Sequence, residues 1–230
     1  MARHLRRKAP YAPDVLLPGD PGRALVLAQH LLTEPKMSNH HRGLWGYTGE
    51  TEGGRPLSIQ STGMGGPSAA IVLHELAEEG VRRALRVGTC GALDESLSLG
   101  ELLCAAAALP RDGASAALGA HRPARPDPAL LERLSGPAEP ATVVSTDLFY
   151  ETDPRERAAW VEAGARAVEM ETASLFALGR RLGVAVASLL VVSDVFPGGE
   201  RRVIDDDSLL EASLRMGEVA SSSLDSDRQP

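Results

Sequence analysis

Residues 61–92, STGMGGPSAAIVLHELAEEGVRRALRVGTCGA, decide the fold of this chain. A Gly-rich turn precedes Pro67, and Gly80 follows the last apolar repeat, which is the pattern of a helix with proline in its first turn and glycine at its end. The apolar residues of that repeat, which predict a buried face, are Ile71, Val72, Leu73 and Leu76, and the residues that predict a face in water are Glu75, Glu78 and Glu79. Residues 84–88 then predict a buried strand ending in a Thr-Cys-Gly turn.

One charged residue, Arg86, interrupts this apolar strand. A buried guanidinium needs a negative partner, because leaving a charge unpaired in the interior is costly. Ligands of open α/β sheets collect beyond the carboxyl ends of the strands, where Arg86 and Thr89 are expected to lie. Two interpretations stay open: Arg86 meets a substrate oxyanion together with Thr89, or it pairs with a structural carboxylate.

A second strand, turn and helix start precede this stretch. Residues 15–17 predict a short strand, residues 18–23 (PGDPGR) a turn, and residues 24–32 a helix. The backbone N–H groups of such a turn can hold an oxyanion, to which Arg23 adds a positive charge. A plain turn without a ligand is the alternative.

Two carboxylates flank Met170 in the sequence VEMETA at positions 168–173. Burying either Glu169 or Glu171 without a partner is unfavourable. On a regular strand the two side chains share a face and point at one ligand, whereas a bulge or a helix start between them separates them.

The most strand-like run of the chain, residues 185–192, stops at Ser193 and Asp194. Residues 196–202 are rich in glycine and charge, which is typical of a mobile flap. We expect loops at residues 38–49 and 110–125, a helix capped by Asp153 over residues 153–163, and a last helix at residues 209–219.

The composition excludes several classes of protein. A chain of 230 residues with 43% hydrophobic content fits one α/β domain, and its net charge of −7 argues against a nucleic-acid-binding surface. Two cysteines without metal-ligand spacing favour a reducing compartment, the cytoplasm. No export signal is visible, and the longest apolar runs fall well short of the ~20 residues of a membrane span. We therefore expect no membrane and no nucleic-acid partner.

Six motifs, read together, resemble the hexameric purine nucleoside phosphorylase and uridine phosphorylase family. They are PGDPxR at 18–23, NHHRGLWGYTG at 39–49, STGMGGPS at 61–68, LRVGTCGA at 85–92, VEMETA at 168–173 and VVSD at 191–194. The resemblance implies a single α/β domain, residues 1–220, with a central mixed β-sheet flanked by helices, and we expect residues 221–230 to be a disordered tail. It also implies a homohexamer, a trimer of dimers, that cleaves purine nucleosides reversibly with phosphate to the free base and ribose or deoxyribose 1-phosphate. Inorganic phosphate is then a co-substrate, and no metal or organic cofactor is implied.

The same resemblance assigns roles to individual residues. The phosphate site comprises Gly19, Arg23, Arg86 and Thr89, with Arg42 lent by a neighbouring subunit. The ribose site comprises Glu169, Met170 and Glu171, with His4 lent by the neighbour. The base site comprises Phe149, Val168 and Ser193, and Asp194 is the general acid, assisted by Arg201 or Arg202.

Purine is favoured over uracil for two reasons. Residues 151–155 lack the Gln-x-Arg pair with which uridine phosphorylases hold the pyrimidine, and Asp194 stands where the purine enzymes carry an aspartate. A uridine phosphorylase, a methylthioadenosine phosphorylase, a hydrolytic nucleosidase and a non-catalytic nucleoside-binding relative are the alternatives.

Overall fold

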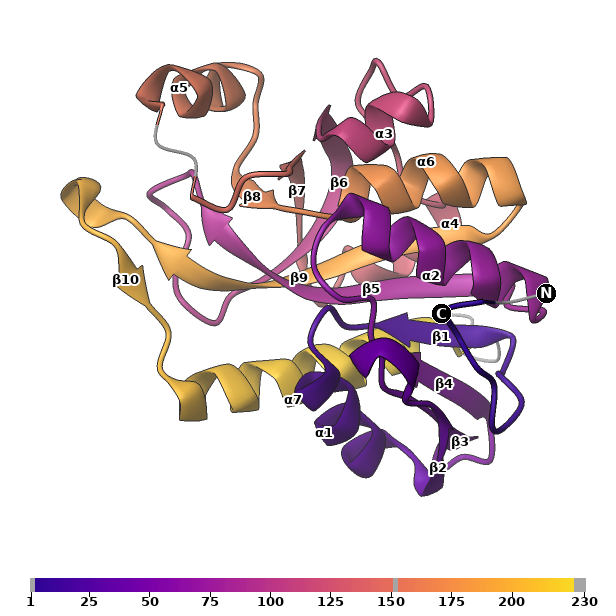
Figure 1. The fold of residues 1–230 in the computed structure, drawn as a ribbon. Coiled ribbons are helices and arrows are strands. Elements are labelled where there is room, and N and C mark those ends of the chain that lie inside the picture. The colour runs from indigo at the N-terminus through magenta and orange to yellow at the C-terminus, as the bar shows by residue number, and fades with distance from the viewer. Residues whose placement is uncertain (1–2, 151–152, 226–230) are drawn as a thin grey trace.

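The strands of this protein form one mixed sheet, which helices cover on both faces (Figure 1). The computed structural model describes residues 3–150 and 153–225, and within them the sheet has ten strands in the order β10-β9-β6-β7-β8-β5-β1-β4-β3-β2. The strands are β1 (Asp14–Leu17), β2 (Thr33–Asn39), β3 (Gly46–Glu50), β4 (Pro56–Gln60), β5 (Arg83–Ala92), β6 (Leu102–Arg111), β7 (Glu139–Thr146), β8 (Ala167–Glu169), β9 (Ala185–Val195) and β10 (Arg202–Val203). The α-helices are α1 (Pro21–Leu31), α2 (Gly66–Glu78), α3 (Gly113–Ala117), α4 (Pro128–Leu134), α5 (Pro154–Glu162), α6 (Thr172–Leu182) and α7 (Asp206–Ser223), with short 3-10 turns η1 (His41–Gly43) and η2 (Pro197–Gly199). The α/β class with a mixed sheet is confirmed.

Strand β5 is the centre of the sheet, because it pairs with three other strands. It runs parallel to β1 and β9, and its last two residues pair antiparallel with β8. Since β9 also pairs with β6, and β7 joins β6 to β8, these strands close into a ring. The strand extends beyond the predicted residues 84–88 because hydrogen bonds to β9 continue to Gly91.

The helices form two layers with separate apolar cores. Helices α2, α3 and α6 contact one another above the sheet in Figure 1, and α1 and α7 contact each other below it. One core includes Leu73 on α2 and Leu175 on α6, and the other includes Leu27 on α1 and Met216 on α7. Helix α5 lies apart and buries Trp160 against Leu109 and Val144.

Helix α2 confirms the predicted element, but its buried face differs from the predicted one. It follows Gly65 at φ +86 and Gly80 turns the chain at φ +99, conformations that glycine adopts without strain. Its fully buried apolar residues are Ala69, Val72, Leu73 and Leu76, which is one helical face, while Ile71 is 40% exposed. Glu75, predicted to face water, is buried.

The predicted loops contain regular structure. The 3-10 turn η1 and strand β3 lie in residues 38–49, where Arg42 adopts a left-handed φ of +61. Helix α3 lies in residues 110–125 and is capped by Asp112, whose Oδ1 accepts from Ser115 N–H at 2.7 Å. Helix α5 confirms the predicted helix, with Asp153 at its N-cap and Pro154 at its first position.

The predicted tail is wrong over its first residues, because helix α7 continues to Ser223 and Leu224 is fully buried. Leu224 continues the four-residue spacing of Met216 and Ala220, whose side chains are also fully buried. The serines between them are polar but anchored: the Ser221 carbonyl accepts from Arg55 Nη2 at 2.8 Å. Residues 226–230 lie outside the described residues. Within residues 3–150 and 153–225, no helix combines the length and apolar character needed to cross a membrane.

We expect Leu224→Ala to lower the free energy of unfolding by about 2–4 kcal/mol, because it empties a fully buried site. The matched control is Leu210→Ala on the same helix, where the side chain is 45% exposed. Urea unfolding followed by circular dichroism measures both. Equal, small effects of the two substitutions would show that the end of α7 does not contribute to the core.

Candidate active site

Several of the predicted site residues lie at or after the ends of β1, β5 and β9. Leu17, the last residue of β1, is in register with Arg86, and the turn after it lies against the Gly-rich loop before α2. Gly63 N–H donates to the Gly19 carbonyl at 3.0 Å, and Thr62 N–H donates to the Pro18 carbonyl at 2.9 Å. Two loops that are more than 40 residues apart in the sequence thus form one wall of the site.

Arg86 is buried and forms ion pairs with both glutamates of the VEMETA stretch. Its Nε donates to Glu169 Oε2 at 3.0 Å, and its Nη2 pairs with Glu171 Oε2. Although burial alone lowers the pKa of Arg86, Glu171 and Glu169 raise it above its ordinary value. Both interpretations of Arg86 therefore have support: it pairs with two buried carboxylates, and its buried Nη1 has no hydrogen-bond partner among residues 3–150 and 153–225.

Arg23 is the second cation of this corner. Its backbone N–H donates to Asp20 Oδ1 at 2.7 Å, which caps α1 and fixes the start of the helix. Burial lowers the pKa of Arg23; the Asp20 carboxylate opposes this effect and the nearby positive charge of Arg86 adds to it. Two guanidinium groups close to a helix N-terminus favour a bound anion.

Glu169 and Glu171 have different roles, although both reach Arg86. Glu169 ends β8 and its side chain is fully buried: it also accepts from Ser145 Oγ and from the N–H groups of Glu171 and Thr172 at 2.9 and 3.0 Å. Its oxygens are thus fully used in fixing the start of α6. The prediction that Glu169 contacts ribose stays a prediction; in this structure its side chain has no exposed surface.

Glu171 is the carboxylate left for a ligand. It follows half-buried Met170, and its Oε1 accepts from Gly65 N–H. Burial raises the pKa of Glu171; Arg86 opposes this increase and the charge of Glu169 adds to it. A carboxylate in this setting gains from hydroxyl donors, which a sugar supplies.

The third part of the site surrounds Asp194, near the end of β9. Ser193 Oγ donates to Asp194 Oδ2 at 2.6 Å, and Arg201 Nε donates to Asp194 Oδ1 at 2.7 Å. The Arg201 guanidinium lies 5.6 Å from the centre of the Phe149 ring, which is 59% exposed. A flat ligand placed between Phe149 and the strand end would thus meet a carboxyl group at its edge.

Gly91 has no side chain, which leaves space beside Asp194. A Cβ at this position would lie 3.4 Å from Val168 Cγ1 and 3.9 Å from Asp194 Cβ, so Val168 and Asp194 border the same space. The register confirms this neighbourhood, because Gly91 pairs with Val168 on β8 and with Asp194 on β9.

Comparison with known proteins identifies the family of the chain. Residues 13–224 match the phosphorylase superfamily. The chain belongs to this superfamily. It is 38% identical over 203 residues to the DeoD-type purine nucleoside phosphorylase of Caldanaerobacter subterraneus subsp. tengcongensis, covering 82% of this chain and 85% of the other. It is 36% identical over 205 residues to the DeoD-type purine nucleoside phosphorylase of Alkaliphilus metalliredigens, covering 84% and 88%. The crystal structure of uridine phosphorylase from Vibrio fischeri ES114 superimposes with a TM-score of 0.82 at 28% identity, covering 93% of this chain and 92% of that one.

Two predicted residues of this superfamily member lie apart from the group around Arg86. Arg42 is exposed on η1 and His4 is half-buried near the start of the chain, and among the described residues neither has a hydrogen bond or ion pair with Arg23, Arg86 or Asp194. The two segments hold each other, since His41 Nδ1 donates to the His4 carbonyl at 3.1 Å.

Glu75 on α2 fastens the His4 segment, and the sequence analysis missed this role. Its carboxylate accepts from the N–H groups of Arg3, His4 and Leu5 at 2.9, 3.0 and 2.7 Å, and from His4 Nδ1 at 2.8 Å. Its signal was hidden because three of these partners are backbone groups some 70 residues earlier in the chain. Although burial opposes the shift, these donors lower the pKa of Glu75 to about 2.

Two more corrections concern the end of the site after Asp194. Arg202 is exposed on β10 and forms no ion pair within the described residues, so Arg201 is the arginine that meets Asp194. The predicted flap is a return turn, since η2 leads into β10, which pairs antiparallel with β9. Phe196 in this turn stacks on the Arg157 guanidinium at 4.1 Å and was missed as a wall of the site.

Residues 151–152, used above to argue against uracil, lie outside the described residues.

Thr89 lies on β5, three residues after Arg86, and is half-buried.

Within the described residues no group of three His, Cys, Asp or Glu side chains is arranged to hold a metal ion.

We expect the stability contributed by Glu75 to depend on pH. Its folded-state pKa, about 2, lies below the ordinary value of 4.5, so the carboxylate stabilises the fold fully above about pH 5 and loses this effect as the pH falls towards 2. The difference in unfolding free energy between the wild type and Glu75→Gln should be on the order of 2 kcal/mol at pH 7 and shrink below pH 5. Urea titrations at several pH values measure it. Glu132→Gln, at an exposed site on α4, is the control, and a pH-independent difference for Glu75→Gln would contradict the expectation.

Proposed function

We propose that this protein is a purine-nucleoside phosphorylase: it transfers the pentosyl group of a purine nucleoside to inorganic phosphate. The observation that carries the proposal is the buried Nη1 of Arg86, which has no hydrogen-bond partner in the part of the chain that the structure describes and lies near the second cation, Arg23. An anion at this point completes the hydrogen bonds of Arg86, and phosphate is the anion that a phosphorolytic reaction consumes. Gly19 and Thr89 complete the proposed phosphate site.

The sugar site lies between the phosphate corner and Asp194. Glu171 accepts hydrogen bonds from ribose hydroxyls, and Met170 packs against the ring. Because Glu171 already pairs with Arg86, the sugar and the phosphate share one charged pair, which holds C1′ and the attacking oxygen close together. A phosphate oxygen forms the new bond to C1′ while the bond from C1′ to the purine nitrogen breaks.

The departing purine takes the electron pair of the broken bond and needs a proton. Asp194 lies at the edge of the space between Phe149 and Val168, where it delivers this proton to the purine ring. In the substrate-free protein Asp194 is an acceptor for Ser193 and Arg201, so it must first take up a proton. The positive charge of Arg201 then favours release of that proton when the base leaves.

The active form is proposed to be a homohexamer, a trimer of dimers. Arg42 and His4 are held together but stay apart from the phosphate corner of their own chain, which fits their lending to a neighbouring subunit. Met64 in the loop before α2 and Ile71 on α2, 84% and 40% exposed, supply apolar surface for such a contact. The cytoplasm is the proposed compartment, and the two free cysteines agree with it.

The proposal is tested by measuring base release from inosine, adenosine, guanosine, uridine and methylthioadenosine, with and without inorganic phosphate. We expect phosphate-dependent cleavage of purine nucleosides. Arg23→Gln should raise the KM for phosphate about tenfold or more, because it removes one of the two cations without leaving Glu169 and Glu171 unpaired. Arg155→Gln, at an exposed arginine of α5, is the matched control.

Other results of this panel identify the alternatives. Cleavage without phosphate would indicate a nucleosidase, preference for uridine a uridine phosphorylase, and preference for methylthioadenosine a phosphorylase of that nucleoside. No turnover of any of the five would favour a nucleoside-binding relative.

A separate substitution addresses the proton donor. We expect Asp194→Asn to lower kcat/KM for inosine roughly 10²-fold or more while the KM for phosphate changes little, because the amide cannot protonate the leaving purine. Asp205→Asn, at the exposed N-cap of α7, removes the same charge and retains the cap. Inosine cleavage at a near-normal rate in Asp194→Asn would exclude this residue as the general acid.

A further inference from the structure

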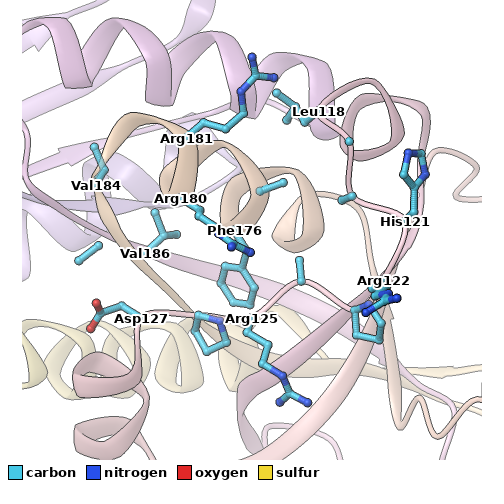
Figure 2. Close-up of a pocket in the computed structure, with 17 residues that line it drawn as sticks. Leu118, His121, Arg122, Arg125, Asp127, Phe176, Arg180, Arg181, Val184 and Val186 are labelled. Carbon is cyan, nitrogen blue, oxygen red and sulfur yellow. The ribbon is translucent and has the colours of Figure 1, made fainter.

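A cavity lies at the opposite end of β9 from Asp194. Its volume is about 990 Å³, and it is bordered by the segment after α3, the second half of α6 and the start of β9 (Figure 2). Ala185 lines it, and nine residues at ~3.3 Å each place Asp194 roughly 30 Å further along the strand. The cavity is therefore distinct from the proposed catalytic site.

Arginine dominates the charge of this cavity. Figure 2 shows Arg180 and Arg181 on α6 and Arg122 and Arg125 on the segment that runs past it. This gathering is unusual in a chain with a net charge of −7. Four guanidinium groups around one cavity favour a ligand with several negative charges.

Most of these cations have no partner in the protein. Among the described residues, Arg122, Arg180 and Arg181 form no hydrogen bond or ion pair, and Arg125 Nη1 reaches only the Ala106 carbonyl, at 3.4 Å. The one carboxylate that lines the cavity, Asp127, is engaged elsewhere: its Oδ1 accepts from the N–H groups of Ala129 and Leu130 at 3.1 Å and caps α4. The guanidinium groups are thus available to a ligand.

A purely structural explanation covers only half of the group. Arg180 and Arg181 lie in the last turn of α6, where positive charges interact favourably with the helix dipole. Arg122 and Arg125 belong to a separate segment outside any helix, so this effect does not account for them. Their place in the lining of the same cavity requires another reason.

The floor of the cavity is apolar. Phe176, Val184 and Val186 line it and are 3–5% exposed. These three side chains leave little surface open, and a ligand with a ring system would cover it, whereas an inorganic anion would not. The combination of an apolar floor with a rim of arginines matches an amphipathic polyanion.

We propose that this cavity binds a nucleoside di- or triphosphate, with the phosphoryl groups on the arginines of α6 and of residues 122–125 and the base against the apolar floor. Its volume falls within the range of small-molecule sites, ~300–1,000 Å³. Each phosphoryl group can accept two parallel hydrogen bonds from one guanidinium, so two or three of them satisfy the unpartnered arginines. The site is independent of the phosphorolytic reaction.

Isothermal titration calorimetry with ADP tests the proposal on the full-length wild type and three variants. Arg180→Gln/Arg181→Gln removes two charges at the cavity, and Lys36→Gln/Arg155→Gln removes two exposed charges elsewhere. Arg23→Gln weakens the proposed phosphate site. We expect ADP to bind the wild type, to bind the cavity variant about tenfold or more weakly, and to bind the other two variants like the wild type. Inorganic triphosphate, which lacks a base, should bind the wild type several-fold more weakly than ADP.

Four outcomes would overturn the proposal. The first is an absence of ADP binding to the wild type at millimolar concentration. The second is a loss of ADP binding in Arg23→Gln with retention in the cavity variant, which would assign ADP to the catalytic centre. The third is equal affinity for ADP and triphosphate, because the apolar floor would then have no ligand. The fourth is a fall in oligomeric mass of the cavity variant, measured by light scattering, together with unchanged ADP affinity, which would identify this face as a contact between copies of the chain. Failure of the proposed phosphorolysis would leave these measurements unaffected.

Discussion

The ion pairs of Arg86 with Glu169 and Glu171 are the interaction on which the rest of the site depends. A guanidinium inside a sheet is tolerated only when carboxylates surround it, and here they come from the turn between β8 and α6. The same contacts fix where α6 starts, because Glu169 also accepts from the first N–H groups of that helix. One buried charge therefore sets the position of β5, β8 and α6 relative to each other and leaves one guanidinium nitrogen for a ligand.

The two glutamates illustrate how neighbouring residues of one type acquire different roles. Glu169 accepts from four donor groups, whereas Glu171 pairs with Arg86 and accepts from Gly65 N–H. Burial raises the pKa of Glu171, so its charged form depends on these donors. The proposed site gains from such a residue, because the anion meets the positive charge of Arg86 and the sugar hydroxyls meet the negative charge of Glu171.

Sequence patterns predicted the parts of this protein that rest on local rules. Pro154 after Asp153 marked a helix start, and Arg86 inside an apolar strand marked a site. The patterns failed where a distant partner decides the outcome. Glu75 is on the buried side of α2 because N–H groups of residues 3–5 satisfy it, and α7 extends past its predicted end because Leu224 has a place in the core. Likewise, the choice between Arg201 and Arg202 depends on how β10 returns along β9, which no spacing reveals.

The arginines of the two sites differ more in their burial than in their number. Arg86 is 4% exposed and its charge is neutralised by fixed carboxylates, so it is held in one geometry, as a reacting centre requires. The cavity arginines beside α6 are exposed and, apart from one long contact of Arg125, unpartnered within the described residues, so they can adjust to a ligand without loss of an existing pair. The first arrangement favours transition-state stabilisation and the second reversible binding. In the two proposals the same residue type serves two purposes at opposite ends of β9, because the environment of each guanidinium differs.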